Sequence, residues 1–134
     1  MIIVQALYGL KSSGAAWRQT LAESLYDMGF SQSKGGPDVH FRVANSSGKD
    51  HYEYILVYVD DLLVWSYSCG PIMDRIGKLY RLKDGSVACP DLYLGTSIVK
   101  TNNGERDMWS MSSDRYISAA IKNVEAYLEE VGER

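Results

Sequence analysis

The first half of the chain opens with a helical pattern of apolar residues. Four of them recur at steps of four, four and three, which is the spacing of one helix face: Trp17, Leu21, Leu25 and Met28. This spacing predicts a helix over residues 13–28, with a serine as its N-cap and Gly29 as its end. The apolar, β-branched stretch over residues 2–7 predicts a short strand ahead of this helix.

A run of alternating and apolar segments then predicts three strands. They span residues 39–44, 52–59 and 62–67, and the glycine-rich or polar segments 31–38 and 45–50 are expected to be a loop and a turn. Only Asp60 and Asp61 separate the second strand from the third. We therefore expect a hairpin with two aspartates at its tip.

The second half predicts two further helices around another hairpin. A helix after Gly70-Pro71 has Ile72, Ile76, Leu79 and Tyr80 on one face, and an irregular segment over residues 81–90 follows it. A strand over residues 91–100, interrupted by Gly95, is predicted to turn at residues 101–104 and return over residues 108–111. The last helix opens near Asp114 and ends at Gly132. Its apolar stripe is expected to be core, with a partner surface as the less favoured alternative, and consists of Ile117, Ile121, Val124, Leu128 and Val131.

This order of elements predicts the fold class. A chain of 134 residues is the size of one domain. Mostly antiparallel strands, with helices packed on one face of the sheet, make an α+β architecture.

The two aspartates break the usual rules of turn chemistry. They interrupt two uncharged runs, residues 55–59 and 62–65, and runs that are apolar on both faces are typical of central strands packed on two sides. Like charges so close raise the pKa of one carboxyl unless a cation compensates. Asp-Asp is also poor hairpin chemistry beside Asn-Gly or Asp-Gly. Such a break is expected at a functional site.

The chemistry of the pair points to a metal ion. A hard cation suits carboxylates that are accompanied by neither histidine nor cysteine, and Mg²⁺ is the usual choice. Two such ions, about 3.5–4 Å apart, can activate an attacking hydroxyl and stabilise the leaving oxygen in phosphoryl transfer. Asp60 and Asp61 are therefore candidate metal ligands. A solvated acidic turn that binds nothing is the less favoured alternative.

Composition limits the other classes. The formal net charge of −3 argues against a self-sufficient nucleic-acid binder and is compatible with one piece of a larger enzyme. Cys69 and Cys89 form no metal-ligand spacing, and we expect free thiols of an intracellular protein. His40 and His51 have no partner spacing either. We expect neither a signal peptide nor a membrane segment, because no basic region precedes a long apolar stretch and the apolar runs are too short to cross a membrane.

An ordered set of motifs resembles a known family. They are Ala6-Leu7-Tyr8-Gly9-Leu10-Lys11 with Trp17, then Tyr58-Val59-Asp60-Asp61, then Leu82-Lys83-Asp84, Tyr93-Leu94-Gly95 and Trp109-Ser110-Met111-Ser112 before Tyr116-Ile117. Together they are similar to the reverse transcriptases of Ty1/copia-type retrotransposons, with the Tyr-x-Asp-Asp motif at residues 58–61. The resemblance is collinear and covers nearly the whole chain.

The resemblance implies a function and a set of site residues. The chain would be one partial reverse-transcriptase domain over residues 1–134, the palm with the start of the thumb or connection, without fingers or RNase H. Asp60 and Asp61 would be two of three carboxylates that hold two Mg²⁺ ions. The residues expected to contact substrate or nucleic acid are Tyr58, Val59, Gly9, Leu10, Lys11, Tyr93, Leu94 and Gly95. Trp17 is expected to be core packing rather than a contact.

The family pattern also implies partners and an activity. These are an RNA or DNA template with its primer, a dNTP, and the remainder of the polyprotein polymerase, in a cytoplasmic retrotransposon particle. The family takes its third metal-binding aspartate from an upstream strand, and none of the first six residues is acidic. We therefore expect this chain alone to be inactive. A decayed or co-opted remnant that binds nucleic acid or protein is the alternative, and a metal-dependent hydrolase is a weaker third reading.

Overall fold

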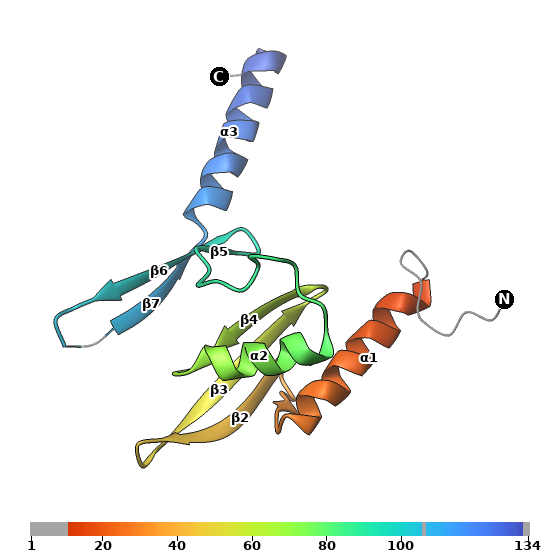
Figure 1. Cartoon of the computed structure of the whole chain (residues 1–134). Helices are drawn as coiled ribbons and strands as arrows, with labels where there is room; N and C mark the ends of the chain where they lie inside the picture. The colour runs from red at the N-terminus through yellow and green to blue at the C-terminus, as the bar shows by residue number, and fades with distance from the viewer. Residues whose placement is uncertain (1–10, 106, 133–134) are drawn as a thin grey trace. The chain divides into compact units, whose positions relative to one another are not determined.

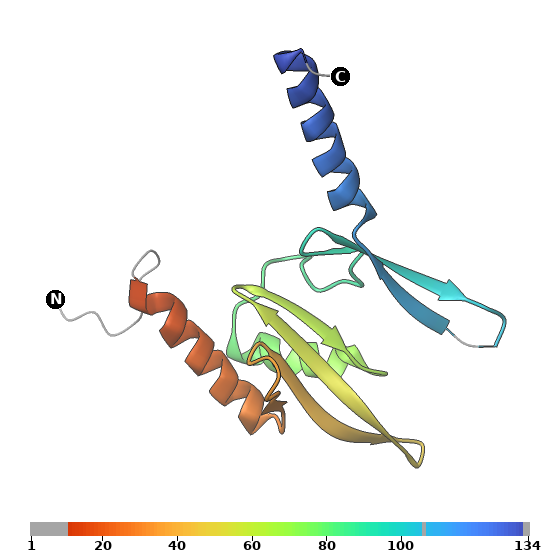
Figure 2. The same cartoon turned by 180° about the vertical axis from the view of Figure 1, so that it is seen from behind.

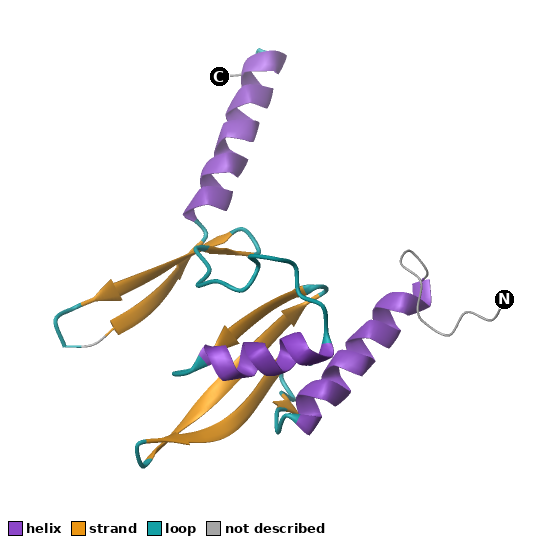
Figure 3. Cartoon of the chain, viewed as in Figure 1, coloured by secondary structure: helices purple, strands orange, loops and turns teal. Residues whose placement is uncertain are grey.

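The computed structural model describes residues 11–105 and 107–132. Its helices are α1 (Lys11–Asp27), α2 (Cys69–Leu79) and α3 (Asp114–Val131). Its strands are β1 (Ser31–Gln32), β2 (Val39–Ser46), β3 (Lys49–Tyr58), β4 (Asp61–Trp65), β5 (Leu92–Tyr93), β6 (Thr96–Asn102) and β7 (Asp107–Ser112). Figure 3 colours helices and strands separately and confirms the predicted α+β class. The predicted strand over residues 2–7 lies outside the described residues.

The chain divides into two compact units, Met1–Leu82 and Lys83–Arg134. The first contains the sheet β1-β2-β3-β4, and the second contains the sheet β5-β6-β7. All strand pairs in both sheets are antiparallel. Figure 1 shows the colour passing from α1 through this first sheet to α2, and then to the second sheet and α3. The interpretation of residues 1–134 as a single partial domain stays a prediction.

The core of the first unit lies between its two helices and one face of its sheet. Its buried residues come from α1, the segment after it, β3 and α2: Leu21, Leu25, Met28, Phe30, Ile55, Val57, Ile72 and Ile76. The predicted stripe of α1 is therefore confirmed as core. The helix ends where expected, because Gly29 has a φ of +87°, a conformation that favours glycine after a helix.

The strand β3 buries one face and leaves the other partly open. Ile55 and Val57 are buried, whereas Tyr52, Tyr54 and Tyr58 between and beside them are 55%, 37% and 56% exposed. We expected this strand to be packed on both faces, and within the first unit only one face is packed. The reason is the alternation of the strand itself, since every second residue is a tyrosine or another side chain that can lie at a half-open surface, and a tyrosine there keeps its hydroxyl in water.

A buried ion pair ties β2 to β3 and to the end of α1. Arg42 donates from Nε to Glu53 Oε2 at 2.7 Å and from Nη1 to the carbonyl oxygen of Met28 at 2.7 Å. Ser66 donates its hydroxyl to the other oxygen of Glu53. The Arg42 guanidinium also lies 4.4 Å over the ring of Phe30. Glu53 is only 5% exposed, so these hydrogen bonds replace the water that its carboxylate lost.

The second unit corrects one predicted strand. We expected residues 91–100 to be one strand with an interruption at Gly95. Instead the chain reverses there, because Tyr93 pairs with Thr96 across a two-residue turn. Leu94 and Gly95 both have a positive φ, +49° and +77°, which matches the twist of a tight hairpin. The turn predicted at residues 101–104 comes later in the chain, because Thr101 and Asn102 still belong to β6 and pair with Met108 and Asp107 of β7.

The predicted apolar stripe of α3 is not core in this unit. No residue of α3 is buried, and Ile117, Ile121, Val124 and Val131 are each about half exposed. The helix itself is as predicted: it opens at Asp114 and ends at Gly132, which has a φ of +74°. The pattern identified an amphipathic helix correctly, but amphipathicity alone does not supply a partner surface.

Candidate functional site

The β3–β4 hairpin places the two aspartates next to each other at one end of the first sheet. Tyr58 and Asp61 form the last pair of the register, so Val59 and Asp60 are the two turn residues. We expected the turn one residue later, at Asp60 and Asp61. The observed register puts Asp61 at the start of β4, on the same face as Tyr58 and opposite the face that packs on the helices.

Both carboxylates are open to solvent. Asp60 and Asp61 are exposed, as are Tyr58 at 56% and Val59 at 68%. No histidine, cysteine or further carboxylate joins them, because the described part of the chain holds no group of three such residues that could bind a metal. Two adjacent carboxylates still suit Mg²⁺, which commonly takes one or two carboxylates and completes its coordination with water and substrate phosphates.

The turn holds a residue in an unfavourable backbone conformation. Val59 has a φ of +52°, in the left-handed region. For a β-branched residue this is a genuine outlier. Such a conformation costs about 1–3 kcal/mol and persists where the surrounding structure enforces it. The contacts of Val59 therefore show what holds the turn.

One of those contacts is a hydrogen bond from α1. The indole Nε1 of Trp17 donates to the backbone carbonyl oxygen of Val59 at 2.9 Å. Trp17 also packs against the core of the first unit and meets the ring of Tyr80 edge to face, with centroids 5.1 Å apart. We expected Trp17 to be core packing, and its packing is confirmed. Its hydrogen bond to the turn was not predicted. The only signal for it in the sequence is the residue type, because the N–H of a packed indole usually has a hydrogen-bond acceptor.

The remaining predicted site residues fall into separate groups. Tyr93, Leu94 and Gly95 form the β5–β6 turn in the second unit. Gly9 and Leu10 lie outside the described residues, and Lys11 begins α1 with its side chain outside the described part. The structure thus brings together Tyr58, Val59, Asp60 and Asp61 in the first unit and Tyr93, Leu94 and Gly95 in the second. The part played by each of them stays a prediction.

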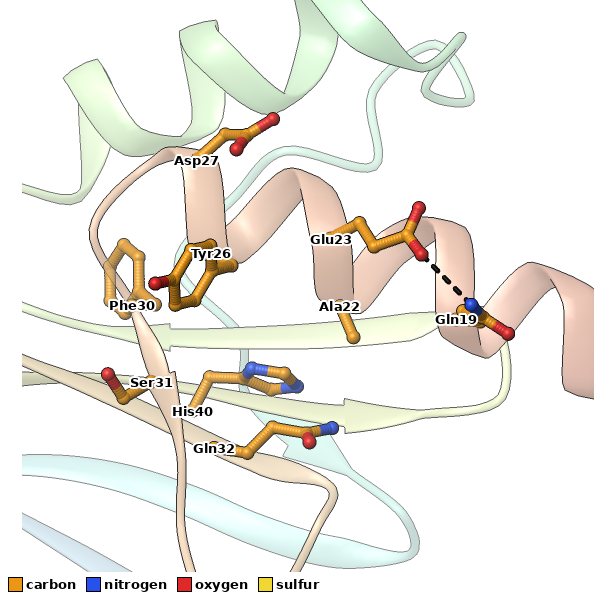
Figure 4. Close-up of a pocket in the computed structure, with 9 residues that line it drawn as sticks. All are labelled: Gln19, Ala22, Glu23, Tyr26, Asp27, Phe30, Ser31, Gln32 and His40. Carbon is orange, nitrogen blue, oxygen red and sulfur yellow. Dashed lines mark hydrogen bonds between the residues drawn. The ribbon is translucent and has the colours of Figure 1, made fainter.

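A shallow cavity of about 380 Å³ lies elsewhere in the first unit, beside the second half of α1 (Figure 4). It is lined by Gln19, Ala22, Glu23, Tyr26, Asp27, Phe30, Ser31, Gln32 and His40, none of which is a predicted site residue. Glu23 is turned toward Gln19, whose amide donates a hydrogen bond to it at 3.0 Å. His40 is buried, and burial lowers its pKa despite the nearby carboxylate of Asp38. The cavity does not belong to the aspartate site.

The remaining expectations concern cysteines and membranes. Cys69 and Cys89 are free thiols, as predicted. Among the described residues, no helix has the length and apolar character needed to cross a membrane.

Comparison with known proteins adds a family relationship to this geometry. The family described as "Reverse transcriptase (RNA-dependent DNA polymerase)" matches residues 2–129 of the chain. The chain is also similar to a Saccharomyces cerevisiae protein named for the transposon Ty5-1, with 36% identity over 124 residues. That match covers 89% of this chain and 37% of the yeast protein, so the chain spans little more than a third of its relative's length. No solved structure matches the chain at a significant level.

Proposed function

Because this chain belongs to the reverse transcriptase family of Ty1/copia-type retrotransposons, we propose that Asp60 and Asp61 bind catalytic Mg²⁺ in an RNA-directed DNA polymerase. The observation that carries the proposal is the position of the pair at the exposed end of a hairpin whose flanking segments, residues 55–59 and 62–65, carry no charge. An acidic turn without a role would need neither apolar flanks nor a strained Val59.

The chemistry follows from what each residue can do. The Asp60 and Asp61 carboxylates would each offer oxygen ligands to Mg²⁺, with water and nucleotide phosphates as the other ligands. Two bound ions would supply activation of the primer 3′-hydroxyl and stabilisation of the leaving pyrophosphate oxygen. Within the described residues, neither carboxylate takes part in an ion pair. A metal ion could therefore bind these carboxylates without first displacing a lysine or arginine side chain.

The residues around the pair would contact substrate. Tyr58 shares a sheet face with Asp61 and is half exposed, so its ring is available to a primer end or a nucleotide base. Val59 would lie beside it. In the family pattern, Gly9, Leu10 and Lys11 would line the nucleotide and template pocket, and Tyr93, Leu94 and Gly95 would lie near the hairpin that grips the primer.

The proposal includes the wider assembly. The template, primer and dNTP would bind a polymerase of which this chain is the palm with the start of the thumb or connection. The net charge of −3 agrees with a chain whose basic nucleic-acid surfaces lie in the remainder of the polyprotein. The cytoplasmic retrotransposon particle is the proposed location.

A second candidate function is a catalytically dead or co-opted remnant that acts as an interaction module. One observation favours it: the described residues provide two carboxylates at the hairpin and no third ligand. The apolar stripe of α3, which is not buried, would also suit a protein partner.

Metal binding by the chain itself tests the leading proposal. Mn²⁺ can stand in for Mg²⁺, and its EPR signal separates free from bound ion. We expect weak binding to the wild-type chain that is lost in the variant with Asp60→Asn and Asp61→Asn. Asp74→Asn removes one exposed carboxylate from α2 and is the matched control, with binding unchanged. Equal Mn²⁺ binding by the wild type and the double variant would refute the proposal.

A further inference from the structure

We propose that Trp17 is a positioning residue for Asp60 and Asp61: its indole N–H holds the carbonyl of Val59 and keeps the hairpin turn in the conformation that presents both carboxylates. The inference rests on the proposed metal-binding function of the aspartates. It concerns a residue that would touch neither metal nor substrate and would act through the backbone of the turn.

The two turn residues do not by themselves favour the backbone conformation of the turn. Only the first of its two residues, Val59, has a positive φ; Asp60 does not. Two-residue hairpin turns of that pattern normally carry glycine at the first position, because glycine has no Cβ to clash. Valine is among the residues least suited to it, since both branches of its side chain crowd the backbone.

A hydrogen bond from outside the hairpin restrains the turn. Trp17 lies 42 positions before Val59 in the sequence and reaches it from α1. In Figure 2 the first half of α1 runs beside the end of the β3–β4 hairpin. A hydrogen bond from a packed helix fixes the direction of the Val59 carbonyl, and with it the peptide plane between Val59 and Asp60.

Trp17 is itself held in place by its contact with Tyr80. Its ring meets Tyr80 edge to face at 5.1 Å. The Tyr80 hydroxyl in turn lies 2.6 Å from Ser24 Oγ and donates to the carbonyl of Thr20 at 3.2 Å, both on α1. Together, α1 and the end of α2 thus form a fixed support for the indole, as a precisely placed ligand set requires.

The consequence concerns both carboxylates. Asp60 directly follows the strained residue, and Asp61 closes the register opposite Tyr58. If Val59 relaxed to a negative φ, the Asp60 side chain would change direction and the Tyr58–Asp61 pair would be disturbed. Residues that orient metal ligands without binding the metal typically change affinity by about 10–100-fold when they are replaced.

The experiment uses Trp17→Phe, which removes the N–H donor and keeps an aromatic ring against Tyr80. In the isotope-labelled chain, the coupling between the amide and α protons of Val59 and their intraresidue NOE report the sign of its φ. We expect Val59 to leave the left-handed region in Trp17→Phe. The affinity for Mn²⁺ alone is expected to fall roughly tenfold.

Rescue separates positioning from a general loss of packing. Glycine occupies the left-handed region without steric cost, so Val59→Gly in the Trp17→Phe background is expected to restore most of the Mn²⁺ affinity. Loss of packing alone would lower the affinity equally in Trp17→Phe and in the double variant that adds Val59→Gly, and that result would overturn the inference. A positive φ of Val59 retained in Trp17→Phe would also overturn it.

The failure of the inference can be told apart from the failure of the metal-binding proposal. If the variant with Asp60→Asn and Asp61→Asn binds Mn²⁺ like the wild type, the metal-binding proposal fails. The inference then falls as well, because it assigns Trp17 to a metal site. If the double aspartate variant loses Mn²⁺ but Trp17→Phe binds it unchanged, only the inference fails.

Discussion

Glu53 on β3 lies directly across from Arg42 on β2, and the two side chains form an ion pair with Nε and Oε2 2.7 Å apart. The carboxylate is almost fully buried, and the guanidinium side chain is 28% exposed. Glu53 lies on β3, the strand that leads into the turn with Asp60. The integrity of the ion pair therefore bears on the sheet that supports the candidate site.

Removal of the arginine should destabilise the first unit strongly. Arg42→Met leaves Glu53 buried without its cation, and breaking a buried pair from one side costs about 3–5 kcal/mol. Urea unfolding, followed by NMR signals from β2 and β3, measures the free energy of unfolding. The matched control is Arg18→Met, because the Arg18–Asp38 pair is about half exposed on both sides. Exposed pairs contribute about 0–1 kcal/mol, so equal effects of the two substitutions would contradict the prediction.

Acid should weaken the same unit through Glu53. Burial alone would raise the pKa of Glu53, but hydrogen bonds from Ser66 and Arg42 outweigh it and hold the pKa below its ordinary value of 4.5. A lowered pKa in the folded state means that this stability is fully present above pH 4.5. It is lost as the pH falls from there through the folded pKa. Glu53→Gln should remove this part of the pH dependence, as measured by urea unfolding between about pH 3 and 6.

His40 should add a separate pH dependence in a higher window. Burial lowers its pKa below the ordinary 6.5, and the carboxylate of Asp38 opposes this shift without cancelling it. As the pH falls, His40 is therefore protonated in the unfolded chain, near pH 6.5, before it is protonated in the folded chain. The stability that neutral His40 contributes to the folded state is lost as the pH falls below 6.5. NMR titration of the His40 ring measures the folded pKa directly. A midpoint at or above 6.5 would show the prediction to be wrong.

Relief of the strained turn should stabilise the hairpin. Val59→Gly removes the Cβ from a residue with a φ of +52°, and Val59 is 68% exposed, so little burial is lost. We expect a gain of up to about 1 kcal/mol in the free energy of unfolding. Val43→Gly on β2 is the control, because Val43 is also exposed but does not have a positive φ. There glycine should lower the free energy of unfolding by about 0.5–1 kcal/mol. Loss of stability in both variants would count against strain at Val59.

The chain by itself should not extend a primer. The described residues hold two carboxylates at the hairpin and no third ligand near them, and two-metal catalysis depends on a complete set of ligands around both ions. Primer extension with Mg²⁺ and dNTPs should therefore give no more product with the wild type than with the variant carrying Asp60→Asn and Asp61→Asn. Incorporation clearly above that variant would overturn the expectation.

Local sequence patterns predicted the elements well where one face of a helix or strand is buried. The stripe of α1 and the strands β2, β3 and β4 lie where expected, with ends that differ from the predicted ones by at most three residues. The turn at Leu94 and Gly95 was not predicted, because a leucine with a positive φ carries no recognisable turn signal. The short strand β1 was expected to be loop, since it exists only through its pairing with β2.

The sequence by itself determined the α+β class, the core stripe of α1, the family motifs and the hairpin that carries Asp60 and Asp61 at its end. These depend on residue periodicity and on neighbours in the chain, which can be read directly. Only the tertiary structure decided that Val59 is strained, that Trp17 donates to its carbonyl and that Arg42 and Glu53 form a buried network. Such contacts join residues far apart in sequence, and their partners are fixed by packing and register, which no local pattern specifies.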